Sequence, residues 1–458
     1  MRVSRDHRIA VAAGAGIGAA VTVWRRWAHT GPGASSVPAD RAILIVGAGF
    51  AGMTVAHRLS KLLGAREGQI HLIDQNNFLL FTPMLTEVAG SELDARHVVA
   101  PARLLAECIA FEQGAVREID LANKSVVLDA GPEGSERRTL EAGHLVIALG
   151  SVSDYHGIPG VKEHSLSLKS INDALAIRNR VLGALEKANW ERDPEVRRKT
   201  LTFVVGGGGY TGVEIMAAVN ALVRSTAREY PNVAPEDVTA IIVEPGGRLM
   251  PELSPALAEF GQRELEKRGV QVRLKTKIAS AGPDFVELDT GERIATGTFI
   301  WSGGVTPHPL VKQLGCELGK HGGIVVDRCF AVPGYPGVWA IGDCAEVPRA
   351  AKPGSYPKTA QVATREGDHL ARNIVAAMRG QAPRPFTFKP IGELALVGRH
   401  SGVGRVFGLS FSGLAAWMLW RGVYLAKMPG MAQRVRIAID WTLDMIFGRN
   451  IARIPLSR

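Results

Sequence analysis

The 458-residue chain has little cysteine, namely Cys108, Cys316, Cys329 and Cys344. These residues are far apart and form no Cys-x-x-Cys pair, so neither a disulfide framework nor a zinc site is expected. We interpret all four as small buried hydrophobic residues, expect no metal ion, and favour a reducing compartment.

Patterns typical of nucleic-acid binding are also missing. The chain has no zinc-finger spacing, no dense Lys/Arg run and no basic segment interspersed with aromatic residues. Its formal net charge of +10 nevertheless predicts an anionic partner. We therefore expect a membrane surface and no nucleic acid.

Apolar residues near the N-terminus form only a short run. Residues 9–24 are rich in Ala and Gly, lie between arginines, and are fewer than the about 20 residues that a spanning helix usually needs. A short membrane anchor, a signal-like segment and a surface helix are all open interpretations. We favour an uncleaved membrane-associated segment within residues 1–40, a region that ends in a Gly/Pro/Ser linker.

A first nucleotide-binding motif begins at residue 42. Residues 42–46 are an apolar run typical of a buried parallel strand, and G-A-G-F-A-G follows at residues 47–52. Gly47 permits a tight turn, and Gly49 lets a pyrophosphate approach the backbone. A helix start then offers N–H groups to the phosphates. Asp74, at the end of the next strand, can accept a hydrogen bond from a ribose hydroxyl.

A second copy of this pattern begins at residue 201. A strand over residues 201–205 leads into G-G-G-G-Y-T-G, in which Gly207, Gly209 and Gly212 occupy the motif positions. The partner strand ends at Glu244. A carboxylate there would repel a 2′-phosphate and accept from a free 2′-hydroxyl, so NADH is favoured over NADPH.

Two further segments indicate that the first nucleotide is FAD. The A-L-G-S run at residues 148–151 and V-W-A-I-G-D-C-A at residues 338–345 resemble features of flavoproteins with two dinucleotide-binding domains. By that resemblance Asp343 should bind the FAD ribityl chain. The alternative is a helix N-cap aspartate. Two such sites on one chain imply hydride transfer from a nicotinamide to a flavin, chemistry that the cofactors supply.

The cofactor-binding residues expected from both motifs share positions at strand ends and helix starts. They are Gly47, Gly49, Phe50, Ala51, Gly52, Asp74, Ala148, Gly150, Gly342, Asp343, Ala360, Gly207, Gly209, Tyr210, Gly212, Glu244 and Gly303.

Glu214 has two compatible interpretations. With Thr211 it forms a T-x-x-E capping box, which is a sufficient structural reason for both residues. Alternatively it lies where the nicotinamide meets the flavin, and there it contacts the carboxamide or steers protons. We therefore count Glu214 as a candidate catalytic residue.

Several segments in order resemble the type II NADH:quinone oxidoreductases. They lie at residues 74–78, 81–90, 206–214, 360–367 and 392–399, within a match over most of residues 41–450. The resemblance implies electron transfer from NADH through FAD to a membrane quinone, ubiquinone or menaquinone, without proton pumping. Disulfide reductases of this fold carry a redox cysteine pair where this chain has Phe78–Pro83, so electrons must leave to an external acceptor.

The family's quinone-side motif is Ala-Gln-x-Ala, which begins here at Ala360. Gln361 matches its first glutamine, whereas Arg365 stands where a second glutamine is common. Arg365 could donate to a quinone carbonyl or lie on a solvated helix face. Gln361 and Arg365 are therefore candidate catalytic residues.

The C-terminal residues 405–458 are aromatic and basic, and they read as two amphipathic helices around Pro429-Gly430. Tryptophan and tyrosine beside basic residues suit a lipid interface. The alternative is a helical hairpin that packs on the catalytic domain or on a second copy in a homodimer. The family resemblance implies a membrane-binding region here, with the catalytic domain facing the cytoplasm.

Together these observations predict an α/β protein with two Rossmann-like dinucleotide-binding domains and a C-terminal amphipathic helical region. We expect residues 41–160 and 298–404 to form the FAD-binding domain and residues 161–297 the NADH-binding domain. Two other functions are considered: a sulfide:quinone oxidoreductase, for which the cysteines form no convincing set, and a non-enzymatic redox-sensing flavoprotein.

Overall fold

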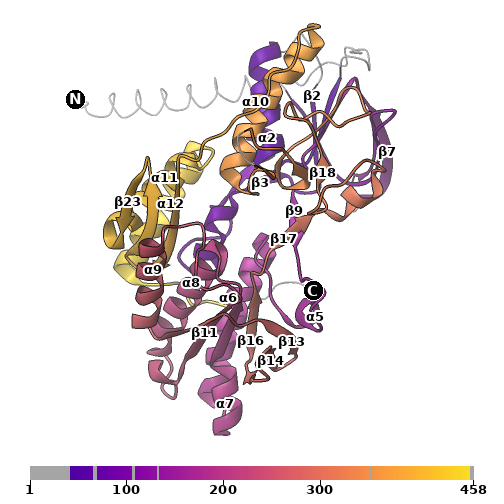
Figure 1. Ribbon diagram of the computed structural model, residues 1–458. Helices are drawn as coiled ribbons and strands as arrows, with labels where there is room; N and C mark the ends of the chain where they lie inside the picture. Colours follow the sequence, from indigo (N-terminus) through magenta and orange to yellow (C-terminus); the bar gives the residue numbers. More distant parts are fainter. Residues whose placement is uncertain (1–41, 65–69, 106–108, 132–133, 351–352, 454–458) are drawn as a thin grey trace, which may run out of the picture.

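The computed structural model describes residues 42–64, 70–105, 109–131, 134–350 and 353–453. The segment 9–24 and Cys108 lie outside the described residues. Figure 1 shows three units: a first sheet with its helices at the top, a second sheet at the bottom, and a C-terminal unit at the side.

The first unit is built on a seven-stranded sheet of order β19-β8-β1-β2-β5-β6-β7. Strand β1 (Ile43–Val46) is fully buried between β2 and β8 and pairs with both in parallel, as expected for a short unbroken apolar run. Strand β19 comes from far along the chain and pairs in parallel with β8. The other strands are β2 (Ile70–Asp74), β5 (Ala110–Asp120), β6 (Ser125–Ala130), β7 (Glu136–Glu141), β8 (His144–Ile147) and β19 (Val338–Ala340).

Helices α2 (Phe50–Leu63) and α10 (Ala360–Met378) lie side by side in this unit (Figure 1). Gly367 permits their close approach, because a Cβ atom there would lie 2.7 Å from the Ala51 carbonyl oxygen. Shorter elements complete the unit: β3 (Phe78–Leu80), β4 (Val99–Pro101), α4 (Ala102–Leu105), β18 (Ile324–Val325) and β20 (Ala345–Glu346). The short helix α3 (Leu85–Ala89) lies between β3 and β4 in sequence, but its side chains pack in the core of the second unit.

The second unit has a four-stranded parallel sheet of order β12-β11-β10-β16. Its strands are β10 (Thr202–Gly206), β11 (Thr239–Glu244), β12 (Val270–Leu274) and β16 (Thr298–Trp301). Because β16 pairs in parallel with β10, this unit extends past the expected boundary at residue 297. Its other elements are α5 (Val161–His164), α6 (Ile171–Trp190), α7 (Pro194–Thr200), α8 (Tyr210–Ala227), α9 (Pro255–Lys267), β13 (Ile278–Gly282), β14 (Phe285–Leu288) and β15 (Arg293–Ala295).

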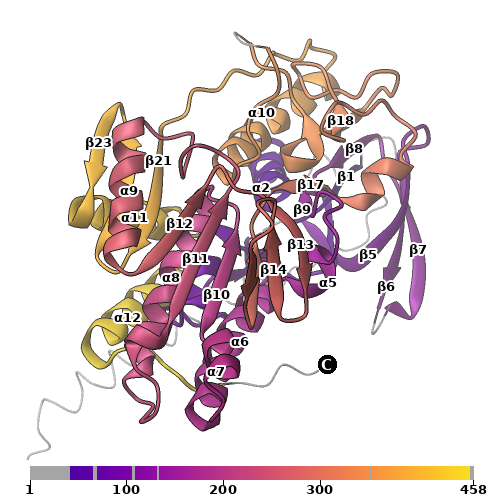
Figure 2. The same cartoon turned by 60° about the horizontal axis from the view of Figure 1, so that its bottom comes forward.

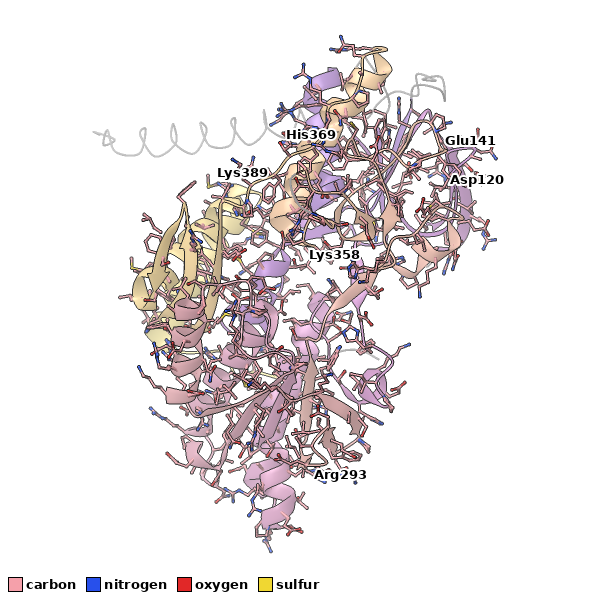
Figure 3. The ribbon with its side chains drawn as sticks, in the orientation of Figure 1. Asp120, Glu141, Arg293, Lys358, His369 and Lys389 are labelled. Atoms are coloured by element: carbon pink, nitrogen blue, oxygen red, sulfur yellow. The ribbon has the colours of Figure 1, made fainter. Side chains whose placement is uncertain are left out.

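A two-stranded antiparallel ribbon of β9 (Ser151–Ser153) and β17 (Val305–Pro307) connects the first and second units. Figure 2 shows it between the two sheets. Lys358, which lies shortly before α10 begins, is at the junction of the two units (Figure 3).

The C-terminal unit contains an antiparallel sheet as well as the two expected helices. Its elements are β21 (Gly392–Gly398), β22 (Ser401–Val406), β23 (Leu409–Ser412), α11 (Gly413–Lys427) and α12 (Met431–Phe447). The expected boundary at residue 404 falls inside β22, which pairs with both β21 and β23. No described helix is both long and apolar enough to cross a membrane.

The aromatic residues of α11 and α12 correct one expectation about this unit. Trp420 and Trp441 are buried, and they share a hydrophobic core with side chains of α6 and α8. They were expected at a lipid interface, but they face inward because the hairpin packs on the second unit. The exposed apolar side chains of the hairpin are instead aliphatic residues, methionines and Phe447.

Candidate active site

The first glycine motif has the geometry of a dinucleotide site. Gly47 has φ +104°, a conformation that L side chains rarely adopt. A Cβ atom at Gly52 would overlap the carbonyl oxygen of Gly47, so glycine is needed where α2 meets the turn. A Cβ atom at Gly49 would meet nothing within 4 Å, so the start of α2 faces open space. Phe50 and Ala51 are the first residues of this helix.

Asp74 ends β2 beside this turn. Its Oδ2 accepts a hydrogen bond of 2.7 Å from the backbone N–H of Ala48, and its Oδ1 accepts one of 2.7 Å from Asn76. Burial raises the pKa of Asp74. The carboxylate is therefore held at the edge of the open space, where a ribose hydroxyl could reach it.

The second glycine motif repeats this geometry. Gly207 has φ +108°, and a Cβ atom there would lie 2.5 Å from the carbonyl oxygen of Ser302. A Cβ atom at Gly212 would overlap the carbonyl oxygen of Gly207, whereas one at Gly209 would meet nothing within 4 Å. The start of α8 thus faces open space, and the residues present fit a second dinucleotide.

Glu244 takes the place that Asp74 has in the first unit. Its Oε2 accepts from the N–H of Gly208 and its Oε1 from that of Gly246, each at 2.6 Å. The guanidinium of Arg248 donates to the carbonyl of Pro251 at 2.6 Å. The Glu244 carboxylate is therefore hydrogen-bonded directly to the glycine turn, whereas the Arg248 guanidinium is not.

Tyr210 and Gly303 border the same turn. The Tyr210 hydroxyl donates to Glu393 of the C-terminal unit at 2.9 Å, and burial together with this carboxylate raises the pKa of the tyrosine. Gly303 follows β16 and leaves no room for a side chain, because a Cβ atom there would overlap the Trp301 ring. Both expected residues therefore lie beside the second site.

Asp343 lies at the carboxyl end of β19, as expected, and is part of a chain of hydrogen bonds between the two units. Its Oδ2 accepts from the Ser151 hydroxyl at 2.6 Å, and the Ser151 oxygen accepts from the ammonium of Lys169 at 3.0 Å. Burial lowers the pKa of Lys169, and the Asp343 charge opposes that effect. Asp343 starts no α-helix, so its position does not support the N-cap alternative.

Glu366 was missed by the sequence reasoning. This buried carboxylate on α10 accepts from the N–H of Gly342 at 2.7 Å, and burial raises its pKa to about 7. It holds the turn that carries Asp343 against α10. The one sequence signal that could have identified Glu366 is its position shortly after the quinone-side motif.

Ala148 and Gly150, which were expected at the cofactor, follow β8, the strand beside this turn. Ala148 is buried, and Gly150 has φ +69°.

Glu214 is not part of a capping box, so that interpretation is wrong. Helix α8 begins after Gly209 and has no side-chain cap, because the glycine turn itself positions the helix start. The Glu214 carboxylate instead accepts from the N–H of Leu396 at 3.0 Å and from the indole of Trp420 at 3.2 Å. Burial raises its pKa to about 8. Glu214 can therefore hold a proton at neutral pH.

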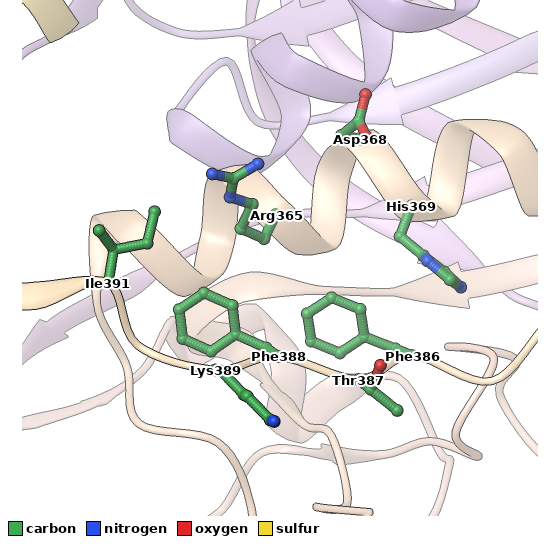
Figure 4. Close-up of a pocket in the computed structure, with 8 residues that line it drawn as sticks. All are labelled: Arg365, Asp368, His369, Phe386, Thr387, Phe388, Lys389 and Ile391. Carbon is green, nitrogen blue, oxygen red and sulfur yellow. The ribbon is translucent and has the colours of Figure 1, made fainter. Parts of the chain in front are cut away.

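Gln361 and Arg365 lie on one side of α10, toward the C-terminal unit. The Gln361 carboxamide accepts from the N–H of Ile391 at 3.3 Å and donates to the carbonyl of Gly392 at 3.5 Å. Arg365 is exposed and borders a pocket of about 270 Å³. In Figure 4 its guanidinium points away from the ammonium of Lys389.

This pocket has an aromatic wall. The rings of Phe386 and Phe388 are stacked with centroids 6.4 Å apart beneath α10 (Figure 4). Burial and then the charge of Arg365 lower the pKa of Lys427 at the end of α11. The pocket therefore combines aromatic side chains with the positive charge of Arg365 and Lys389.

Aromatic residues occupy the position where disulfide reductases carry their cysteines. Phe81 packs edge-on against Phe50, with centroids 5.7 Å apart, and against Tyr424 at 6.1 Å. Among the described cysteines, Cys316, Cys329 and Cys344 are free. Of these only Cys344 is buried, so the expectation of burial is wrong for Cys316 and Cys329.

Comparisons with known proteins also indicate a nucleotide-dependent oxidoreductase. A family model described as "Pyridine nucleotide-disulphide oxidoreductase" matches residues 41–367, and one described as "NDH2 C-terminal domain" matches residues 391–450. The chain is 31% identical over 416 residues to a "Probable NADH dehydrogenase" of Dictyostelium discoideum, covering 90% of each protein. It is 30% identical to a "Type II NADH:quinone oxidoreductase" of Staphylococcus aureus, covering 82% of this chain and 92% of that protein.

The chain belongs to the type II NADH:quinone oxidoreductases. The family expected from the sequence is thus confirmed, and so is its reaction, the transfer of electrons from NADH through FAD to a quinone. Family membership also implies binding of FAD and NAD(H).

Solved structures share the fold. NDH2 from Plasmodium falciparum in complex with NADH superposes with a TM-score of 0.83 at 19% identity, covering 90% of this chain and 100% of that chain. The sulfide:quinone oxidoreductase from Aquifex aeolicus reaches a TM-score of 0.68 at 17% identity, covering 90% and 96%. The α/β class is therefore confirmed.

Proposed function

We propose that the first unit of this type II oxidoreductase holds FAD and that the second holds NADH. The open space beside Gly49, with Asp74 bonded to the glycine turn and the Gly342-Asp343 turn next to Ala51, supports the FAD position. The matching space beside Gly209, with Glu244 at its edge, supports the NADH position. When bound, the flavin accepts the hydride and passes electrons on.

Glu244 is the proposed reason for a preference for NADH. Two backbone N–H groups fix its carboxylate, so it cannot turn away from a 2′-phosphate without losing both hydrogen bonds. It would accept from a free 2′-hydroxyl and repel a phosphate. The Arg248 guanidinium donates to the Pro251 carbonyl and makes no ion pair with Glu244.

We place the quinone headgroup where Gln361 meets the first residues of the C-terminal unit. Gln361 presents an amide that could exchange its bonds to Ile391 and Gly392 for a bond to a quinone carbonyl. Arg365 contributes positive charge at the edge of the pocket beside α10, and its guanidinium points away from the ammonium of Lys389.

The C-terminal unit is the proposed attachment to a membrane surface. Its hairpin exposes apolar side chains on α11 and α12 although Trp420 and Trp441 face inward. Apolar side chains of this kind, with arginines and lysines nearby, suit the interface between headgroups and acyl chains. The most exposed of them are Leu414, Met418, Met431, Val435, Ile439, Leu443, Met445, Ile446 and Phe447. The dinucleotide-binding units would then face the cytoplasm.

The experiment that tests this proposal is oxidation of NADH and NADPH by the full chain in liposomes, with ubiquinone and menaquinone analogues as acceptors. We expect fast flavin bleaching by NADH, reoxidation by quinone, and slower oxidation of NADPH. A flavin that NADH reduces but that no quinone reoxidises would contradict the acceptor and favour a redox sensor. Loss of NADH oxidation when the cysteines are replaced by serine would instead favour the sulfide enzyme.

A further inference from the structure

Lys169 reaches from the second unit to the FAD position proposed above. It directly precedes Ser170, the N-cap of α6, and its backbone N–H donates to Asp173 at 2.9 Å. The Ser170 side chain accepts from the N–H of Asp173 at 3.1 Å, so a capping box fixes the start of this long helix. The backbone of Lys169 is therefore held firmly in place.

The Lys169 ammonium has a single hydrogen bond within the described part of the chain. It donates to the Ser151 hydroxyl at 3.0 Å, and that hydroxyl donates to Asp343 Oδ2 at 2.6 Å. An ammonium group has three N–H donors, so two of them are left without an acceptor among the described residues. Lys169 also forms no ion pair with a described carboxylate.

Asp343 shows the complementary pattern. Its Oδ2 accepts from Ser151, whereas its Oδ1 accepts from none of the residues that the structure describes. The Ser151 hydroxyl thus lies between the ammonium and the carboxylate, and the two charged groups do not use each other up in a direct ion pair. Two N–H donors and one acceptor oxygen are therefore left to bind a ligand.

The position of Lys169 makes unused donors costly. The side chain is partly buried, and a buried cation without acceptors carries a desolvation penalty. Lys169 lines a cavity of about 380 Å³ between β9 and the segment that leads to α6. A ligand group therefore has space beside the ammonium.

The surrounding charges favour a ligand that carries or gains negative charge. Burial lowers the pKa of Lys169, Asp343 opposes this effect, and the charge of Lys358 adds to it, so a second cation acts on the same place at the junction of the two units (Figure 3). Of the two acids, Asp343 and Glu366, the second is partly protonated at neutral pH because burial raises its pKa to about 7. A flavin gains negative charge when it is reduced, so this environment suits it.

We propose that Lys169 is a FAD-binding residue that the second unit contributes. Its ammonium fixes Asp343 through Ser151 and donates its remaining N–H groups to the cofactor beside that aspartate. The unit proposed to bind NADH thereby also helps to hold the flavin. This assignment rests on the function proposed above, because it requires FAD in the first unit. Lys169 lies outside both glycine motifs, so sequence motifs gave no sign of it.

The affinity of the full chain for FAD in a Lys169→Met variant tests this role. Methionine keeps a long flexible side chain but has neither the charge nor an N–H donor. FAD is removed from the parent and from the variant, and each protein is titrated with FAD while flavin fluorescence is followed. We expect the dissociation constant to rise at least about tenfold. Lys169→Arg keeps the charge and the donors, so it should bind FAD within about threefold of the parent.

The reduction potential of the bound flavin is a second readout, which a purely structural role of Lys169 would not move. With FAD at saturation, loss of the cation should disfavour the reduced flavin by about tenfold, or about 30 mV for a two-electron couple. Redox titration of Lys169→Met against a reference dye measures this shift. Either an unchanged dissociation constant or an unchanged potential would overturn the assignment.

Lys162→Met is the matched control. Lys162 lines the same cavity, but it is exposed and its side chain forms no hydrogen bond or ion pair with a described residue. Its replacement should leave both the affinity for FAD and the potential unchanged. Equal losses in Lys162→Met and Lys169→Met would assign the effect to the general charge of the cavity and refute a specific role of Lys169.

Asp343→Asn separates failure of this inference from failure of the proposed function. The variant should also weaken FAD binding, because Asp343 is part of the proposed FAD position. Normal FAD binding by Asp343→Asn would refute that position. Normal binding by Lys169→Met, with weak binding by Asp343→Asn, would refute the role of Lys169 alone.

A further variant keeps the proposal testable if Lys169→Met does not fold. Ser151→Ala removes the hydroxyl that joins Lys169 to Asp343 and leaves both charges in place. We expect its dissociation constant for FAD to rise at least about threefold. Unaltered FAD binding by Ser151→Ala would contradict a chain of hydrogen bonds that acts on the cofactor.

Discussion

The indole N–H of Trp420 donates to the carboxylate of Glu214 at 3.2 Å. Trp420 is fully buried on α11, and Glu214 lies on the helix that starts at the second glycine motif. The contact therefore joins the hairpin proposed for membrane attachment to the unit proposed for NADH binding. A substitution in the hairpin should therefore affect the second unit, and a substitution in the second unit should affect the hairpin.

Trp420→Phe tests this contact. The variant keeps most of the buried ring but leaves Glu214 without its indole donor, so we expect the free energy of unfolding to fall by about 1–3 kcal/mol. Urea unfolding followed by tryptophan fluorescence is the measurement. Trp190→Phe is the control, because Trp190 is 83% exposed at the end of α6. Equal stability of both variants would refute the importance of the contact.

Stability should depend on pH through Glu214. Burial raises its pKa from 4.5 to about 8, so the folded state favours the neutral form, and stability is lost as pH rises from about 4.5 to 8. Glu214→Gln removes this penalty. We expect the variant to gain on the order of 2–4 kcal/mol relative to the parent between pH 5 and pH 8. A stability difference that does not change with pH would contradict a buried, titrating Glu214.

Two glycines of the second motif should respond differently to alanine. Gly212→Ala places a Cβ atom on the carbonyl oxygen of Gly207 and should destabilise folding by several kcal/mol, on the order of 3 or more. Gly209→Ala meets no protein atom within 4 Å, so folding should be nearly unchanged. Binding of NADH should nevertheless weaken at least about tenfold, because the methyl group enters the proposed phosphate space.

Thermal unfolding and NADH titration of the two variants separate these effects. A Gly209→Ala protein that binds NADH normally would place the dinucleotide elsewhere.

Glu244→Gln tests nucleotide preference. The amide removes the negative charge that opposes a 2′-phosphate while retaining a similar size. The ratio of kcat/KM for NADH to that for NADPH should fall at least about tenfold, or about 1.4 kcal/mol of discrimination. Arg248→Ala is the comparison, since its guanidinium is bonded to Pro251, and we expect it to change this ratio by less than about threefold. If Glu244→Gln discriminates between NADH and NADPH as the parent enzyme does, Glu244 is not the residue that sets the nucleotide preference.

Charge on the exposed face of α12 should release the protein from membranes. Val435 and Ile439 are 51% and 50% exposed. We expect the double replacement by glutamate to reduce co-sedimentation with liposomes by about tenfold without loss of ferricyanide activity. Leu104→Glu, at an exposed apolar residue of the first unit, should leave sedimentation unchanged. Equal effects of the two changes would refute attachment through α12.

The sequence by itself determined both nucleotide-binding units. An apolar strand, a glycine turn, a helix start and an acid lie within short stretches of chain, and their chemistry is local. Gly47, Gly207, Asp74 and Glu244 were therefore found at the positions expected. The family motifs, which are continuous in sequence, likewise predict Gln361 as a candidate site residue.

Only the tertiary structure decided what surrounds Glu214 and which way the C-terminal tryptophans face. The periodicity of α11 and α12 predicts two amphipathic helices but does not say which face packs on protein. Glu87 and Trp441 meet although they are 354 residues apart in sequence. No local pattern encodes such a contact, because it depends on how the three units pack together and on the burial that this packing imposes on charged side chains.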